Sequence, residues 1–431
     1  MGIDLKSHKL KYKTMRVNGK RTLLAAIIAI LILISAKSDV HHFTQTDYAA
    51  GPHAFSLVRW ELRHVPLKWL HLLWEKYPGH KPNDAERNSI IKDYLATTLK
   101  LQKELVSLDN SPTLNRLIDT TSISQTTLKN KEIEYLQRKR EALRGRAEEA
   151  IESSVSSAAR NNNLGLPLGL LIPPTDFRLG DPPHILITSR RDKIELTGSK
   201  LIKPNLEWSD RTEIESKAEQ YENTSALVDD LAGLGTYPAI VSDKDELRQL
   251  MRTAAHEWLH NYWILKPLGR NMWSSQNMQI LNETAADLAG NELGDEAFEV
   301  LGNTTVNSYR YDSLNPGNSH LIRILRETRT VVEEMLENGE IEKAEQYMDK
   351  QLWNLKLGGY NIRKLNQAYF AFRGNYAESP ASISPIGQEL RELRGYFDNV
   401  GDFIESLSQI GDYGQFQYVL NLKRKQLFIN K

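Results

Sequence analysis

The stretch that decides the fold reads Thr253-Ala-Ala-His256-Glu257-Trp-Leu-His260-Asn-Tyr-Trp263. It ends a segment in which apolar residues recur at spacings of three and four, which predicts an amphipathic helix. These residues are Leu247, Leu250, Met251, Ala254, Ala255, Trp258 and Leu259. Asp243 or Asp245 can cap the start of the helix. On such a helix His256 and His260 lie one turn apart on the same face, so both imidazoles can reach one metal ion.

Glu257 lies between these two histidines and is predicted to act as a general base. Its carboxylate lies beside the ion, close enough to take a proton from a water that the ion binds. A catalytic zinc ion usually has three protein ligands. No third histidine follows at short spacing, since the next one after His260 is His320. The third ligand is therefore expected on another segment.

A second amphipathic helix is predicted around Leu281-Asn282-Glu283-Thr-Ala-Ala-Asp287-Leu-Ala, where Glu283 lies 23 positions beyond His260. Glu283 and Asp287 are four residues apart and share one helix face. We expect Glu283 to be the third ligand and Asp287 to accept the free ring N–H of a ligand histidine. Glu292 is the rival ligand, but it lies nine residues further on, too far along a continuous helix to share the site.

The two motifs, His-Glu-x-x-His and Asn-Glu-x-x-x-Asp, resemble those of the gluzincin metallopeptidases, which include thermolysin-like enzymes and a group of aminopeptidases. The resemblance covers roughly residues 236–292. It implies a zinc-dependent peptidase with His256, His260 and Glu283 as ligands to Zn²⁺ and Glu257 as the general base. The sequence lacks a Gly-x-Met-x-Asn motif upstream, so the resemblance does not imply exopeptidase activity.

The composition limits the alternatives. With 431 residues the chain can bury a large core, and we expect two or three subdomains. Lys plus Arg equals Asp plus Glu at 55 each, so global charge does not indicate nucleic acid as a partner. The chain has no cysteine, which excludes disulfides, thiolate metal ligands and a cysteine nucleophile.

The N-terminal region predicts a membrane-targeting segment. Residues 1–21 are basic, and the run from Thr22 to Ala36 is uncharged and strongly apolar. This pattern predicts a single-pass anchor in the cell membrane with the body outside the cytoplasm. A cleaved signal peptide is the alternative. Residues 54–76 read as an amphipathic helix, which suits either a membrane interface or packing on the body.

The rest of the chain is predicted from periodicity and turn signals. Long charged helices over 84–108 and 126–159 indicate a helical hairpin that ends near Gly165. A β-hairpin over 184–198 and a short strand over 237–241 precede the metal helix, and we expect the latter to be a sheet edge that pairs with an extended substrate. Further helices are expected at 317–338, 340–357, 361–373 and 386–396.

Three residues of this C-terminal part are candidates for stabilising an oxyanion opposite the metal: Arg373, Tyr376 and His320. The predicted segments are a basic cytoplasmic tail (1–21), a transmembrane anchor or signal peptide (22–37), a helical region (38–165), a zincin-like metal-binding region (166–295) and a C-terminal helical region (296–431).

Together these features predict an α+β fold, mostly helical, with a zincin-like core in which a small sheet is followed by two metal-bearing helices. The favoured function is a membrane-anchored zinc peptidase that acts on peptide or protein substrates outside the cytoplasm. Two alternatives stay open: a non-catalytic membrane-tethered helical protein in which zinc is structural or absent, and a zinc hydrolase of a non-peptide amide. Glu257 distinguishes a catalytic site from a structural one, since a structural site needs no carboxylate between the histidines.

Overall fold

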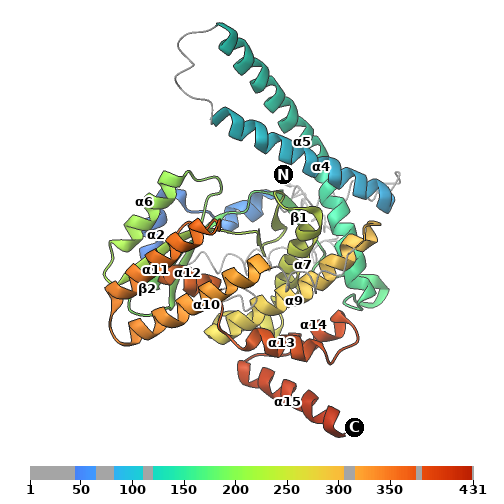
Figure 1. Cartoon of the computed structure of the whole chain (residues 1–431). Helices are drawn as coiled ribbons and strands as arrows, with labels where there is room; N and C mark the ends of the chain where they lie inside the picture. Colours follow the sequence, from blue (N-terminus) through green and yellow to red (C-terminus); the bar gives the residue numbers. More distant parts are fainter. Residues whose placement is uncertain (1–43, 65–81, 110–119, 305–315, 375–380, 430–431) are drawn as a thin grey trace, which may run out of the picture.

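The computed structural model describes residues 44–64, 82–109, 120–304, 316–374 and 381–429. The described chain is mostly helical and contains two small sheets of three strands each. The predicted α+β class with a helical majority is therefore confirmed. Figure 1 shows the two helices that carry the motifs, α7 and α9, in the middle of the molecule, with helical layers on several sides of them.

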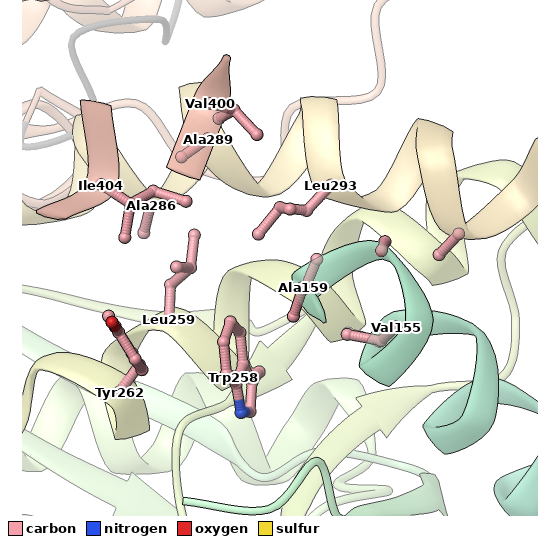
Figure 2. Packing of buried hydrophobic residues seen from close by; sticks show 14 of the residues in the cluster. Val155, Ala159, Trp258, Leu259, Tyr262, Ala286, Ala289, Leu293, Val400 and Ile404 are labelled. Carbon is pink, nitrogen blue, oxygen red and sulfur yellow. The ribbon is translucent and has the colours of Figure 1, made fainter. Parts of the chain in front are cut away.

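The metal-motif helices form the centre of the largest hydrophobic core. Helix α7 spans Leu247–Trp263 and helix α9 spans Gln276–Val300. Both lie where apolar periodicity predicts a helix, because their buried residues recur at helical spacing. Figure 2 shows Trp258 and Leu259 of α7 pointing into the core that α9 and two further helices complete.

Two glycines inside α9 let the two helices approach closely. A Cβ added to Gly290 would lie 2.9 Å from the Cα atom of His256, and one added to Gly294 would overlap the backbone of Arg252. Glycine in a helix interior costs about 1 kcal/mol relative to alanine, which these positions accept because only glycine fits there. The backbone of α9 therefore lies directly on α7, and the helix continues through both glycines.

A long helical hairpin packs its base against this core. It consists of α4, Asp84–Asp109, and α5, Thr120–Asn161, as predicted. Figure 1 shows its far end projecting away from the rest of the chain. The largest hydrophobic core contains residues from both of the predicted segments that meet after Gly165. The predicted segment boundaries therefore stay predictions.

The cap predicted for α7 is wrong. Its N-cap is Glu246, and no side chain caps it. Asp243 is instead buried, where it accepts hydrogen bonds from the Tyr94 hydroxyl and from the guanidinium of Arg140. These partners lie on α4 and α5, so the carboxylate joins the hairpin to the segment that enters the metal helix.

The predicted β-hairpin is present in one of the two sheets. Strand β2, His184–Arg190, pairs in antiparallel fashion with β3, Leu196–Ile202, and on its other side with β4, Thr224–Asp230. Helix α6, Trp208–Glu219, connects β3 to β4 and packs against this sheet.

The second sheet corrects the prediction of the edge strand. Its order is β1, Phe177–Gly180, then β6, Ala239–Ser242, then β5, Gly233–Leu234. The strand predicted to be the edge is β6, which pairs with β1 on one side and β5 on the other. The edge next to the metal helix is β5. With two residues, one of them glycine, it is too short to give a strand pattern in the sequence.

The described residues of the C-terminal region contain the four predicted helices and two more. The four are α10 Pro316–Glu337, α11 Ile341–Leu357, α12 Gln367–Arg373 and α13 Ile386–Arg394. Helix α12 starts later than predicted because the Asn366 side chain caps it by accepting from the backbone N–H of Tyr369. The additional helices are α14 Val400–Ser408 and α15 Tyr413–Ile429.

Short elements complete the described chain. They are α2 Gln45–Ala50, α8 Pro267–Arg270, and the 3₁₀ turns η1 Gly51–His53, η3 Pro167–Gly169 and η4 Met272–Ser274. Of the amphipathic helix predicted over 54–76, residues 57–64 are helical, and its remainder after residue 64 lies outside the described residues.

The prediction of a single-pass membrane protein requires correction. In the ranges that the structure describes, every helix is either too short or too polar to cross a membrane. The basic tail 1–21 and the apolar run 22–37, on which the anchor and the extracytoplasmic location rested, lie outside the described residues. The membrane anchor and the localisation derived from it are therefore not retained.

Candidate metal centre

The structure brings the three predicted ligands together. The Nε2 atoms of His256 and His260 are 2.9 Å apart, and Oε2 of Glu283 lies 3.6 Å from the first and 3.5 Å from the second. Helix α7 provides the histidines and α9 provides the carboxylate. Among the residues described, these three form the one group of three His, Asp or Glu side chains close enough to hold a metal ion.

Asp287 orients the first histidine. Its Oδ1 atom lies 2.9 Å from Nδ1 of His256, so the ring donates its Nδ1–H to the carboxylate. Nδ1 then carries the proton, and the lone pair of Nε2 points toward His260 and Glu283. The arrangement follows from the helical spacing, because Asp287 lies one turn beyond Glu283 on the same face of α9.

The charges in this cluster interact strongly. Burial lowers the pKa of His256, but the hydrogen bonds to Asp287 and Glu283 outweigh burial and leave that pKa well above its usual value. Burial raises the pKa of Glu283, yet the neighbouring His260 and His256 lower it far more, and the net shift is downward. Glu283 is therefore an ionised carboxylate directed at two imidazoles.

Glu257 lies next to the histidines on α7 and points toward the strand β5. Its side chain is buried, with 7% of its surface exposed. A Cβ at Gly233 would overlap the Glu257 carboxylate, and one at Gly235 would lie 3.0 Å from Cβ of His260. The glycines let the edge strand lie directly over the helix. Burial raises the pKa of Glu257, and the nearby His256 and His260 oppose that rise only in part.

Asn261 holds this edge in place. Its side-chain amide donates to the carbonyl oxygen of Thr236 at 3.0 Å, in the turn between β5 and β6. The contact ties the end of α7 to the turn that follows the strand covering Glu257.

A cavity of about 370 Å³ opens beside the cluster. His256 and Glu257 line it from α7, Asp287 lines it from α9, and Gly233 lines it from β5. A predicted ligand, the candidate base and the sheet edge therefore line one cavity, as expected for a ligand-binding site.

The remaining predicted residues lie in different places. Arg373, at the end of α12, lines the cavity, and its Nε donates to Asp229 at 2.8 Å. His320 is exposed, contacts Tyr360 and is not part of the cavity wall. Tyr376 lies outside the described residues. The rival ligand Glu292 forms an ion pair with Arg394, away from the three converging donors.

Sequence reasoning missed several cavity residues. Gln249, Arg252 and Thr253 line it from α7, and Asn291 lines it from α9. The signal that could have found the first three is their spacing from His256, because positions three, four and seven residues before a ligand share its helix face.

Comparisons with protein-family models, with curated proteins and with solved structures found no match.

Proposed function

We propose that this chain is a zinc-dependent peptidase in which His256, His260 and Glu283 hold the ion and Glu257 is the general base. The observation that carries the proposal is that three side chains able to bind a metal converge from two helices, while a fourth side chain, the buried carboxylate of Glu257, lines the cavity that His256 also lines. That combination is typical of a catalytic metal site.

The donor atoms fit a zinc ion. Zinc–ligand bonds of about 2.1 Å in a tetrahedral arrangement place ligand atoms about 3.4 Å apart. The two distances from Glu283 to the histidines, 3.5 and 3.6 Å, match this value. The separation between the two Nε2 atoms, 2.9 Å, is shorter and has to open by about 0.5 Å for that geometry. Two imidazoles and one carboxylate are also a donor set that catalytic zinc uses.

The chain's own residues supply the rest of the chemistry. When bound, zinc polarises a substrate carbonyl and makes water acidic enough to react near neutral pH. Glu257 takes the proton of the attacking water and passes it to the leaving amine, and burial brings its pKa closer to the working pH. Asp287 keeps His256 in the tautomer and orientation that ligation requires. Arg373, which lines the cavity, is the described candidate for stabilising the oxyanion.

The order of elements supports a zincin-like core. Strands β5 and β6 precede α7, and α9 follows with the third ligand. The edge strand β5 lies over Glu257 and lines the cavity, and a sheet edge of this kind can pair with an extended chain. A peptide is the substrate that uses such an edge, and this favours a peptidase over a hydrolase of a non-peptide amide.

The alternative of a non-catalytic protein with a structural zinc has less support. Structural zinc sites are closed by four protein ligands, whereas three donors and an adjoining cavity leave one position open. Glu257 would also have no role there, although burying a carboxylate costs free energy unless it is compensated.

Metal analysis of the full chain combined with an unbiased peptide-library digest tests the proposal. We expect about one zinc per chain and zinc-dependent cleavage of peptides. His260→Ala should remove the metal, and Glu257→Gln should keep the metal and lose hydrolysis. Full activity of Glu257→Gln would refute the mechanism, and full zinc occupancy in His260→Ala would refute the ligand assignment.

The oxyanion assignment has its own test. Arg373→Ala should lower kcat by roughly 10²-fold or more with little change in KM, because the interaction strengthens only in the transition state. A rise in KM of the same size, with kcat unchanged, would place Arg373 in substrate binding instead.

A further inference from the structure

Polar side chains line the cavity toward the N-terminal end of α7, away from His260. The proposed catalytic mechanism gives them no role. Gln249, Arg252 and Thr253 precede His256 by seven, four and three residues, so all face the same side of α7. Asn291 joins them from α9, one turn beyond Asp287. We call these four residues the polar subsite.

Arg252 is a rigid member of the polar subsite. Its Nε and Nη2 donate to Oδ1 and Oδ2 of Asp295 at 2.7 and 2.9 Å, and 14% of its side chain is exposed. This two-point contact fixes the guanidinium plane and leaves the Nη1 donors for another acceptor. The group is therefore held in place before any ligand arrives, which lowers the entropy cost of binding.

The side chains of the other three members have hydrogen-bonding capacity to offer a ligand. Within the described part of the chain, no residue is hydrogen-bonded to the side chain of Gln249, Thr253 or Asn291. Thr253 is buried, with 7% of its surface exposed, yet its hydroxyl forms no such bond. A cluster of two amides, a hydroxyl and a fixed guanidinium offers several donors at one place, which is what a carboxylate group requires.

The acidic side chains of the cavity wall already have cationic or ring N–H partners nearby. Asp230 accepts from Arg211 at 3.0 Å and contacts His184 at 2.7 Å. Asp287 accepts from His256 at 2.9 Å. These contacts offset the negative charges that would repel an anion, and Glu257 belongs to the proposed catalytic group at the other end of the cavity.

The position along the helix sets which part of a substrate reaches the polar subsite. Arg252 lies four residues before His256, which is about 6 Å along the helix axis. One residue of extended chain spans about 3.3 to 3.6 Å, and an acidic side chain adds a similar reach. The group bound there therefore belongs to the residue next to the scissile bond.

We propose that the polar subsite binds a carboxylate of the substrate, carried by a residue next to the scissile bond as its side chain or its free C-terminus. The inference rests on the proposed peptidase function, because it uses the metal cluster to place the scissile bond.

Calorimetric binding of short peptides to the full-length Glu257→Gln chain tests the inference without turnover. The peptides are acetyl-Ala-Ala-X-Ala-amide with X as Glu, Gln or Lys, and acetyl-Ala-Ala-Ala with either a free or an amidated C-terminus. We expect the Glu peptide, the free-acid peptide, or both, to bind about tenfold or more tightly than the matched neutral peptide. The Glu pair and the terminus pair identify which source of carboxylate the subsite takes.

Two charge-matched variants locate the interaction. Asn291→Asp places a negative charge in the polar subsite and should abolish most of that preference, because it weakens binding of the acidic peptides far more than binding of the matched neutral peptides. Asn277→Asp adds the same charge to the same helix, at an exposed position about 21 Å away along its axis, and should preserve the preference.

The inference is wrong if the Lys peptide binds best, if neither acidic peptide is preferred, or if Asn291→Asp weakens the Gln and Glu peptides equally. Zinc content and library hydrolysis, measured separately on the wild-type chain, report on the peptidase proposal. A carboxylate preference without zinc-dependent hydrolysis would leave the polar subsite standing and overturn the peptidase assignment.

Discussion

Gly290 offers the sharpest test of how the fold sets the metal site. Its missing side chain lets α9 lie on α7 at His256 itself: an added Cβ would be 2.9 Å from both Cα and N of His256 and 3.1 Å from its Cβ. Ordinary contacts of this kind are about 3.5 to 4.0 Å. Gly290→Ala therefore forces the two helices apart by about 0.5 to 1 Å at the site of the ligands.

The expected effect on stability is small, because two contributions oppose each other. Overpacking costs about 1 to 3 kcal/mol. Replacing a glycine inside a helix by alanine recovers about 1 kcal/mol. The net loss should therefore be between about 0 and 2 kcal/mol, and the variant should fold.

The expected effect on metal binding is large. Glu283 and Asp287 move with α9, while the histidines stay on α7. We expect zinc affinity to fall by at least about tenfold, as when an orienting partner of a ligand is lost. Competition titration with a chelator measures the affinity, and denaturant unfolding of the metal-free chain measures stability.

Gly414→Ala in α15 is the control, since that position is exposed and far from the core helices in sequence. It should leave zinc affinity unchanged. If Gly290→Ala folds with wild-type stability and binds zinc as tightly as the parent, the close contact between α7 and α9 does not position the ligands.

Two further predictions concern the same pair of helices. Arg248 and Arg252 hold the pKa of Asp295 below its usual value even though burial raises it, so this ion pair stabilises the fold above a pH of about 4 and the contribution fades as pH falls further. Asp295→Asn should therefore cost about 1 to 3 kcal/mol in urea unfolding at pH 7 and less at pH 3, and an equal loss at both pH values would contradict the electrostatic explanation. Glu283→Ala should abolish tight zinc binding whereas Glu292→Ala should not, and the reverse result would show that the ligand has been misassigned.

The helices that carry the motifs could be predicted because their signals are local. The apolar spacing of α7 and α9 and the four-residue separation of Glu283 and Asp287 are set by the helical repeat alone. From these spacings the sequence also indicated which side chains share a face. The structure places His256 and His260 beside Glu283, but it does not test whether they bind zinc.

The parts that were missed depend on contacts between distant segments. Asp243 was a plausible cap by position, yet its partner Arg140 lies 103 residues away and competes successfully for the carboxylate. Strand β5 has only two residues, so pairing with β6 and packing on α7 define it rather than any pattern of its own. A glycine such as Gly290 within a helical sequence pattern does not indicate which other helix packs against it.

The spacing along α9 links the metal site to the polar subsite. Glu283, Asp287 and Asn291 are each four residues apart, so one face of the helix presents a candidate ligand, its orienting partner and a recognition group in sequence. Because α7 runs alongside with its own residues in the opposite order, each turn of α9 meets a turn of α7: Gly290 meets His256, and Gly294 meets Arg252. We therefore expect variants that separate α9 from α7 to impair zinc binding and the proposed carboxylate preference together.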